Sequence, residues 1–92
     1  MDEKIIEDSI GNKYWYLGDN LHREDGPAIE FVNGGKEWWI NGKRHREDGP
    51  AIEWAYGGHE WWINGIEYSF SEWISFTNKS KEEKCELVLT YG

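Results

Sequence analysis

The sequence predicts a mainly β protein, an open antiparallel meander of three tandem β-hairpins with a short helical cover at its C-terminal end. Three observations support this fold class. One stretch of sequence occurs twice in succession, apolar and polar residues alternate within each copy, and Asn and Gly separate the alternating runs. A chain of 92 residues is the size of one small domain, so we expect residues 1–92 to form a single domain.

The internal repeat is the clearest feature of the chain. Residues 21–43 and 44–66 are identical at 17 of 23 aligned positions, and both contain the segments HREDGPAIE and EWWING. An identity this high at a fixed offset indicates two copies of one supersecondary unit. Residues 4–20 follow the same pattern more weakly, with Trp15 aligned on Trp38. We therefore expect a degenerate first hairpin at 4–20, because terminal repeats often differ where they cap a stack.

Turn residues divide each unit into two short strands. An alternating run from Pro27 to Val32 ends at Asn33-Gly34-Gly35, and a Trp-rich run from Lys36 to Ile40 ends at Asn41-Gly42. Asn and Gly accept positive φ angles, which tight turns require. Each unit is therefore predicted to be a β-hairpin.

The alternation assigns side chains to two faces of the predicted sheet. The predicted core face carries Ile6, Trp15, Leu17, Ile29, Phe31, Trp38, Ile40, Ile52, Trp54, Trp61 and Ile63. The predicted opposite face carries Glu7, Tyr16, Ala28, Glu30, Glu37, Trp39, Ala51, Glu53, Glu60 and Trp62. On this assignment Trp38 and Trp61 are buried, and Trp39 and Trp62 point the other way.

The repeat stops before residues 67–92, which we expect to form a helical tail. Ser69 and Glu72 have the spacing of a capping box, as do Ser80 and Glu83. These patterns predict short helices at about 70–77 and 81–89, with a final strand at 87–89 as an alternative to the second. The tail is expected to bury Phe70, Trp73 and Ile74 against the sheet, because a lone meander leaves its core face wet.

Charge and composition exclude several classes of function. The net charge of −8 repels phosphate backbones, so direct nucleic-acid binding is not expected. One cysteine, no apolar run of membrane length and no signal-peptide pattern at the start favour a cytoplasmic protein. No motif for a catalytic centre, a metal site or a cofactor is present, and a repeated set of polar groups is not typical of an enzyme.

The paired turns and the strands ending in Trp-Trp-Ile-Asn-Gly-Lys resemble the MORN-like repeats of the YwqK type. Residues 38–43 fit that pattern, and Trp61 to Gly65 fit it again, with Ile66 in place of the Lys. The HREDGPA segment also resembles repeats of small phage-encoded proteins. The resemblance covers about residues 4–66. It implies an open β-meander and a role in the cytoplasm of a phage host.

Two groups of residues are candidates for binding. The HRED loops supply an Arg and His rim that suits an anion, unless their charges serve to hold the loops together. The aromatic row suits a planar ligand or a protein partner, unless it only packs on long side chains. Together the candidate ligand- or partner-binding residues are Tyr16, His22, Arg23, Trp39, Arg44, His45, Arg46 and Trp62.

These candidates predict a non-catalytic binding protein. In the first hypothesis it inhibits a host defence factor by protein binding. In the second it sequesters a nucleotide-like signalling molecule, and in the third it is a structural assembly module. The two free edges of an open meander also predict a homodimer, strengthened by salt that screens the negative charge.

Overall fold

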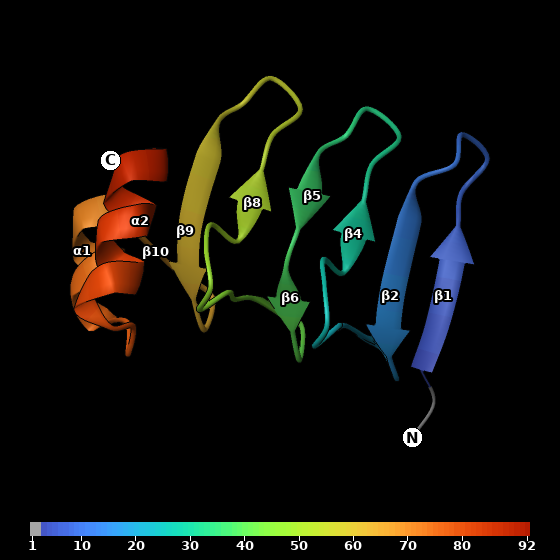
Figure 1. Ribbon diagram of the computed structural model, residues 1–92. Helices are drawn as coiled ribbons and strands as arrows, with labels where there is room; N and C mark the ends of the chain where they lie inside the picture. Colours follow the sequence, from blue (N-terminus) through green and yellow to red (C-terminus); the bar gives the residue numbers. More distant parts are fainter. Residues whose placement is uncertain (1–2) are drawn as a thin grey trace.

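The computed structural model describes residues 3–92, so residues 1 and 2 of the predicted single domain lie outside the described range. The chain forms a row of short antiparallel strands with two helices at one end (Figure 1). The strands are β1 (Glu3–Glu7), β2 (Lys13–Leu17), β3 (Asn20–Leu21), β4 (Ile29–Glu30), β5 (Lys36–Glu37), β6 (Trp39–Ile40), β7 (Lys43–Arg44), β8 (Ile52–Glu53), β9 (His59–Ile63) and β10 (Ile66–Tyr68). The helices are α1 (Phe70–Phe76) and α2 (Lys81–Tyr91). The predicted mainly β class with a helical C-terminal part is therefore confirmed.

The sheet is a meander in which neighbours in sequence are neighbours in space. Its order is β1-β2-β4-β5-β8-β9-β10, β3 also pairs with β2, and β6 and β7 form a separate pair. Both β3 and β4 pair with β2, through Tyr16 to Leu21 and Tyr14 to Ile29. The segment between β3 and β4 therefore leaves the sheet as a loop and returns to the same neighbour. This loop is the HREDGP segment, and it sits above the sheet without interrupting the strand order.

The backbone hydrogen bonds recur at the offset of the sequence repeat. The amide of Asp8 donates to the carbonyl of Asn12, and the same bond joins Phe31 to Gly35 and Trp54 to Gly58. Trp15 donates to Ala28, as Trp38 does to Ala51. Residues with the same place in the repeat thus make the same bonds at several points along the chain.

The predicted division of side chains between the two faces is wrong. Within each unit, the first strand is offset by one residue relative to the second, so its side chains point to the opposite faces from those predicted. Ile29 lies opposite Glu37 in the ladder, and Ile52 lies opposite Glu60. Residues directly opposite each other share a face, so Ile29 and Ile52 lie on the face away from Trp38 and Trp61. The cause is the turn after Glu30, in which Phe31 bonds Gly35 around three residues. A shift of one residue in register moves every side chain of a strand to the other face.

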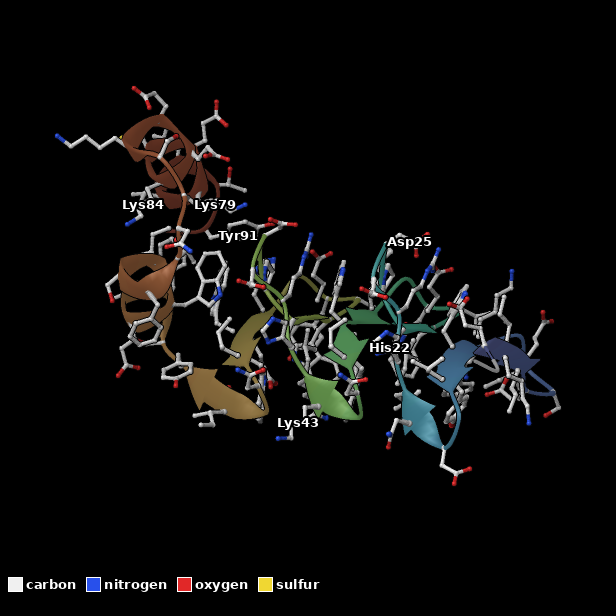
Figure 2. All side chains as sticks on the ribbon, turned by 90° about the horizontal axis from the view of Figure 1, so that it is seen from below. His22, Asp25, Lys43, Lys79, Lys84 and Tyr91 are labelled. Atoms are coloured by element: carbon white, nitrogen blue, oxygen red, sulfur yellow. The ribbon has the colours of Figure 1, made fainter. Side chains whose placement is uncertain are left out.

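The structure therefore has two faces that we name by what they carry. The loop face carries Trp15, Trp38 and Trp61, together with the HREDGP loops and the helices. The Arg44 face carries Glu37, Trp39, Arg44, Glu60 and Trp62. Figure 2 shows Asp25, Lys79 and Tyr91 on one side of the sheet and Lys43 on the other. As predicted, Trp39 and Trp62 point away from Trp38 and Trp61.

The buried core is small and lies along the middle of the sheet and under the helices. Buried apolar residues are Ala28, Ile29, Ala51, Ile52, Trp61 and Trp73. Trp38, which was predicted to be buried, is only half-buried. The difference between Trp38 and Trp61 arises because an arginine covers Trp38, whereas the helices cover Trp61.

Both helices begin at the predicted capping boxes. The hydroxyl of Ser69 accepts the amide of Glu72, and the hydroxyl of Ser80 accepts the amide of Glu83. The second helix continues to Tyr91, so the alternative of a strand at 87–89 is wrong. Within residues 3–92, neither helix has the length and apolar character needed to cross a bilayer.

An aromatic cluster joins the helices to the last long strand. The ring of Trp61 lies 4.5 Å from Trp73, 4.9 Å from Phe70 and 5.1 Å from Tyr91, measured between ring centroids. Trp73 is completely buried, and its indole nitrogen donates to the carbonyl of Arg46. Tilted and edge-on aromatic pairs of this kind add stability beyond the apolar area they bury.

We predict that Trp61→Ala lowers the free energy of unfolding by about 3–5 kcal/mol, because it removes the centre of this cluster. The matched control is Leu89→Ala, whose side chain is 86% exposed and should change stability by less than about 0.5 kcal/mol. Urea unfolding followed by circular dichroism measures both values. Similar midpoints for the two variants would contradict the assignment of the core.

Candidate functional site

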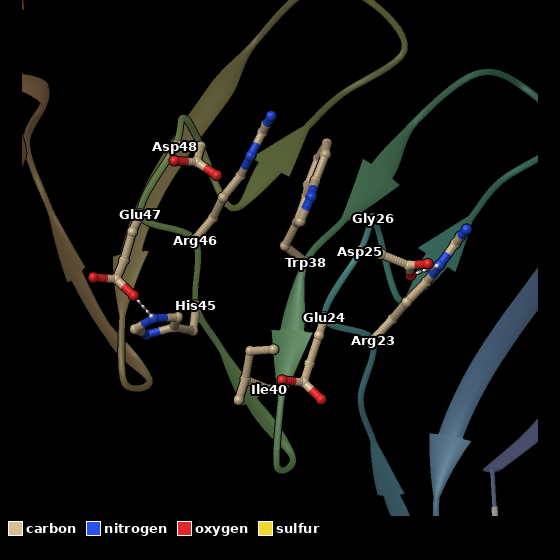
Figure 3. A pocket seen from close by; sticks show the side chains of 10 residues that line it. All are labelled: Arg23, Glu24, Asp25, Gly26, Trp38, Ile40, His45, Arg46, Glu47 and Asp48. Carbon is tan, nitrogen blue, oxygen red and sulfur yellow. Dashed lines mark hydrogen bonds and ion pairs between the residues drawn. The ribbon is translucent and has the colours of Figure 1, made fainter. Parts of the chain in front are cut away.

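The arginines of the HRED loops are held against the sheet. The guanidinium of Arg23 lies 4.1 Å from the ring centroid of Trp15, and that of Arg46 lies 3.8 Å from Trp38. Figure 3 shows the Arg46 side chain alongside the indole of Trp38. A guanidinium over an indole face is an attractive cation–π contact. The arginine of each loop therefore packs on the Trp that precedes the loop in the sequence.

The same arginines also hold their own loops closed. Arg46 donates from Nη1 to the carbonyl of Pro50 at 3.0 Å and to the carboxylate of Glu53 at 3.0 Å. Arg23 makes the equivalent bonds to Pro27 and Glu30, both at 3.1 Å. These contacts engage Nη1 of each guanidinium, and Nε of Arg23 also donates to Asp25. The structure thus favours a structural role for Arg23 and Arg46.

The histidines of the loops are fixed by the next turn of the chain. Nδ1 of His22 accepts the backbone amide of Asn41 at 2.9 Å, and Nδ1 of His45 accepts that of Asn64 at 3.0 Å. Both asparagines have a φ of +50°, so these bonds stabilise a left-handed turn residue. Nδ1 must be unprotonated to accept, which leaves the proton on Nε2 of the neutral ring. Each histidine therefore links its loop to the next Asn-Gly turn through a hydrogen bond.

The loop tips leave their acidic side chains in solvent. The side chains of Glu24, Asp25, Glu47 and Asp48 are between 75% and 86% exposed. They line a groove of about 630 Å³ between the two loops, whose floor is Trp38 and Ile40 (Figure 3). A second groove of about 530 Å³ lies one unit earlier, between β1 and the first loop. The loop face therefore carries exposed acidic loops, and a groove borders each of them.

One of these acidic tips already holds a cation from the helical tail. The ammonium of Lys79 donates to the carboxylate of Asp48. This hydrogen bond holds the pKa of Asp48 below its usual range and raises the pKa of Lys79. The equivalent residue, Asp25, instead accepts from its own Arg23 at 3.0 Å.

The Arg44 face holds a different arrangement. The guanidinium of Arg44 lies 5.1 Å from the ring centroid of Trp39 and 4.9 Å from that of Trp62. Each indole is fixed by a carboxylate, since Trp39 donates to Glu37 at 3.0 Å and Trp62 donates to Glu60 at 3.0 Å. Arg44 is therefore clamped between two indoles whose orientations are themselves set by hydrogen bonds.

The structure separates the predicted site residues into two groups. Arg23, His22, Arg46 and His45 lie with the loops, whereas Arg44 lies with Trp39 and Trp62 on the other face. Tyr16 shares the Arg44 face and is paired with Leu21 in the ladder. The three arginines thus do not converge on one ligand.

Sequence reasoning missed the side chains that remain most available. The sequence left open whether the charges of the HRED loops hold the loops together, and only the structure shows that Glu24 and Glu47 lie beside the histidines of their own loops. Lys79 carried no motif, and Lys43 was noted only as the last residue of the Trp-Trp-Ile-Asn-Gly-Lys pattern. Asp48 and Lys79 are far apart in sequence, so no local pattern could have joined them.

Comparison with protein-family models, with curated protein sequences and with solved structures found no match to this chain. Within the described residues no group of three His, Cys, Asp or Glu side chains is arranged to hold a metal ion.

We predict that Lys79→Gln raises the pKa of Asp48 toward its ordinary value of 3.8, because the variant removes the ammonium that lowers it. In the native protein the ion pair is present above this depressed pKa and is lost as the pH falls through it. A carboxyl-carbon NMR titration measures the change. Glu72 is the internal control, because Ser69 lowers its pKa and Lys79 does not contact it. An unchanged Asp48 titration in Lys79→Gln would contradict the pairing.

Proposed function

We propose that this chain is a non-catalytic binding module, built from three tandem hairpin units, that holds a basic protein surface against its acidic loops. The recurrence of the same backbone bonds at equivalent positions of the repeat supports the tandem-unit description. The resemblance to YwqK-type MORN-like repeats and to small phage-encoded proteins supports a partner in the host cell. Blocking a host defence factor is the role that this resemblance implies.

The observation that carries the proposal is the orientation of charge at the HRED loops. The positive groups, Arg23 and Arg46, face inward onto indoles, while the negative groups at the tips face outward. The arginines are therefore packed against the sheet, whereas the acidic side chains stay 75–86% exposed even where Asp25 bonds Arg23 and Asp48 bonds Lys79. A surface of this kind attracts a cationic partner and speeds its association.

The contact of Lys79 with Asp48 supports a cationic partner in a second way. The protein's own tail seats an ammonium on one loop tip, so the tip can accept a lysine in a defined geometry. At the first loop Asp25 is 86% exposed, and its cationic neighbour is the Arg23 of its own loop. A partner's lysine or arginine has room to occupy the equivalent place there.

The spacing of the loops suggests the form of the partner. Equivalent loops are separated by two strand positions, which is about 10 Å in a sheet. An extended peptide advances about 3.3 Å per residue, so basic side chains three residues apart would match adjacent loops. The groove between the loops would then lie beneath the intervening residues.

The duplicated loops also support a non-catalytic role. His22 and His45 make the same bond to the following turn, and Arg23 and Arg46 share their bonds to a proline carbonyl and a glutamate, so these four polar groups form two structural copies. A catalytic centre ordinarily needs one asymmetric set of acid, base and stabilising groups. The nucleotide-sequestering hypothesis is weakened because two of its three arginines are bonded within the protein.

The proposal predicts binding of a peptide with lysine at every third position. The triple variant Glu24→Gln, Asp25→Asn and Glu47→Gln should weaken this binding at least about tenfold at physiological salt, since charge-assisted hydrogen bonds would be lost. Isothermal titration calorimetry measures the affinity of the full chain for the peptide.

The matched control is Glu67→Gln, Glu82→Gln and Glu86→Gln, which makes the same change in net charge at exposed positions away from the loops. It should bind the peptide nearly as tightly as the native protein. Equal weakening in both triple variants would mean that only the overall charge matters, and the loop surface would then be rejected as the site.

A further inference from the structure

Arg44 breaks the repeat on the face opposite the acidic loops, where the preceding unit has a different type of residue. The equivalent position of the preceding unit is Leu21, which lies in the ladder opposite Tyr16, as Arg44 lies opposite Trp39. The backbone is the same at both places, since Gly42 donates to the carbonyl of Leu21 and Gly65 donates to that of Arg44. An apolar side chain is therefore enough for the fold here.

The guanidinium of Arg44 is less satisfied than those of the loop arginines. Its Nε is buried and has no hydrogen-bond partner among the described residues. The nearest carboxylate oxygen, on Glu37, is 3.7 Å away and already accepts from the indole of Trp39. Arg23 and Arg46, in contrast, each bond a carbonyl and a carboxylate. A buried donor without an acceptor is costly, so the geometry at Nε shows that the protein does not saturate this guanidinium, and a ligand can reach its outer N–H groups.

A hollow lies beside this guanidinium. It has a volume of about 340 Å³ and is lined by Trp39, Lys43, Arg44, Trp62 and Asn64, with the backbone of Gly42 and Gly65. The carbon stem of Lys43 runs past Gly65, at a distance where an added Cβ would just touch it. The stem of Lys43 therefore lies beside the turn that borders the hollow. In the preceding unit the residue equivalent to Lys43 is Asn20.

Charges of both signs surround the hollow. Lys43 and Arg44 supply two cations. Glu37 and Glu60 are the carboxylates of the same face, and both oxygens of Glu60 accept from the indoles of Trp54 and Trp62. Glu67 lies opposite Trp62 in the ladder, so it is on the far side of that indole from Arg44. The hydrogen bonds from the indoles fix the carboxylates but leave their negative charge, so an anion would have to bind through direct hydrogen bonds to the outer N–H groups of Arg44.

We propose that Arg44 and Lys43 form an oxyanion-binding site, which takes a phosphate or carboxylate group between the edges of Trp39 and Trp62. The clamped guanidinium offers its outer N–H groups to two oxygens of the ligand, as planar guanidinium groups do. The indoles fix the guanidinium and screen it from water. The site lies on the opposite face from the acidic loops, so it is independent of the basic-partner surface.

Titration of the full chain with inorganic phosphate or with acetate tests this site. Chloride holds the ionic strength constant, and the change in total tryptophan fluorescence, to which Trp39 and Trp62 contribute, reports binding. We expect a saturable change with at least one of the two anions. Saturation by phosphate alone identifies a phosphate site, and saturation by acetate alone identifies a carboxylate site. Absence of saturation with both anions would overturn the proposal.

The repeat supplies the test variants. Arg44→Leu and Lys43→Asn place the residues of the first unit in the second, so both are expected to fold. Each should weaken anion binding, Arg44→Leu by at least about tenfold, because it removes the charge-assisted donors. Glu86→Gln, an exposed position on α2 away from this hollow, is the control and should bind as the native protein does. Native affinity in both Arg44→Leu and Lys43→Asn would show that the anion binds elsewhere and would overturn the proposal.

Discussion

The stacking of a loop arginine on the tryptophan of the preceding strand is the contact on which the rest of the structure depends. Each HREDGP segment leaves the sheet and returns to the same neighbouring strand, so the loop needs contacts that fix it against the sheet. Arg46 does this by lying 3.8 Å from the ring centroid of Trp38 while bonding Pro50 and Glu53. One repeat after Arg46 the equivalent position is Ser69, which caps α1 instead. There Trp73 takes the place of the arginine over Trp61 and closes the row with an aromatic contact.

This arrangement places the acidic side chains of the loops and the guanidinium of Arg44 on opposite faces of the sheet. The cations of the loops are turned toward indoles, which leaves the acidic tips exposed on the loop face. On the other face Arg44 stands where the first unit has Leu21, and its buried Nε lacks a partner among the described residues. A repeat in which both units were identical would offer only duplicated contacts. Because Arg44 replaces the leucine of the first unit, the Arg44 face carries one group that the repeat does not duplicate.

Much of the fold could be predicted from the sequence, because its signals are local. The turn residues, the fixed offset of the repeat and the capping boxes at Ser69 and Ser80 each specify short-range geometry. The assignment of faces failed because it depends on whether the turn after Glu30 contains an odd or even number of residues, and Asn-Gly-Gly permits both. The site was harder to predict. Arg23 and Arg44 lie on opposite faces because the HREDGP loop leaves the sheet and packs on one face. Asp48 pairs with Lys79 because the helical tail packs against the second loop.

The contrast between Arg46 and Arg44 gives the most direct measurement of the central claim. If loop arginines hold the fold and Arg44 does not, Arg46→Met should lower the free energy of unfolding by about 2 kcal/mol or more, since it strands the carboxylate of Glu53 and uncovers Trp38. Arg44→Leu should change it by less than about 1 kcal/mol, because Leu is the residue of the first unit. Urea unfolding of the two variants under identical conditions decides the matter. A larger loss of stability in Arg44→Leu than in Arg46→Met would contradict the account.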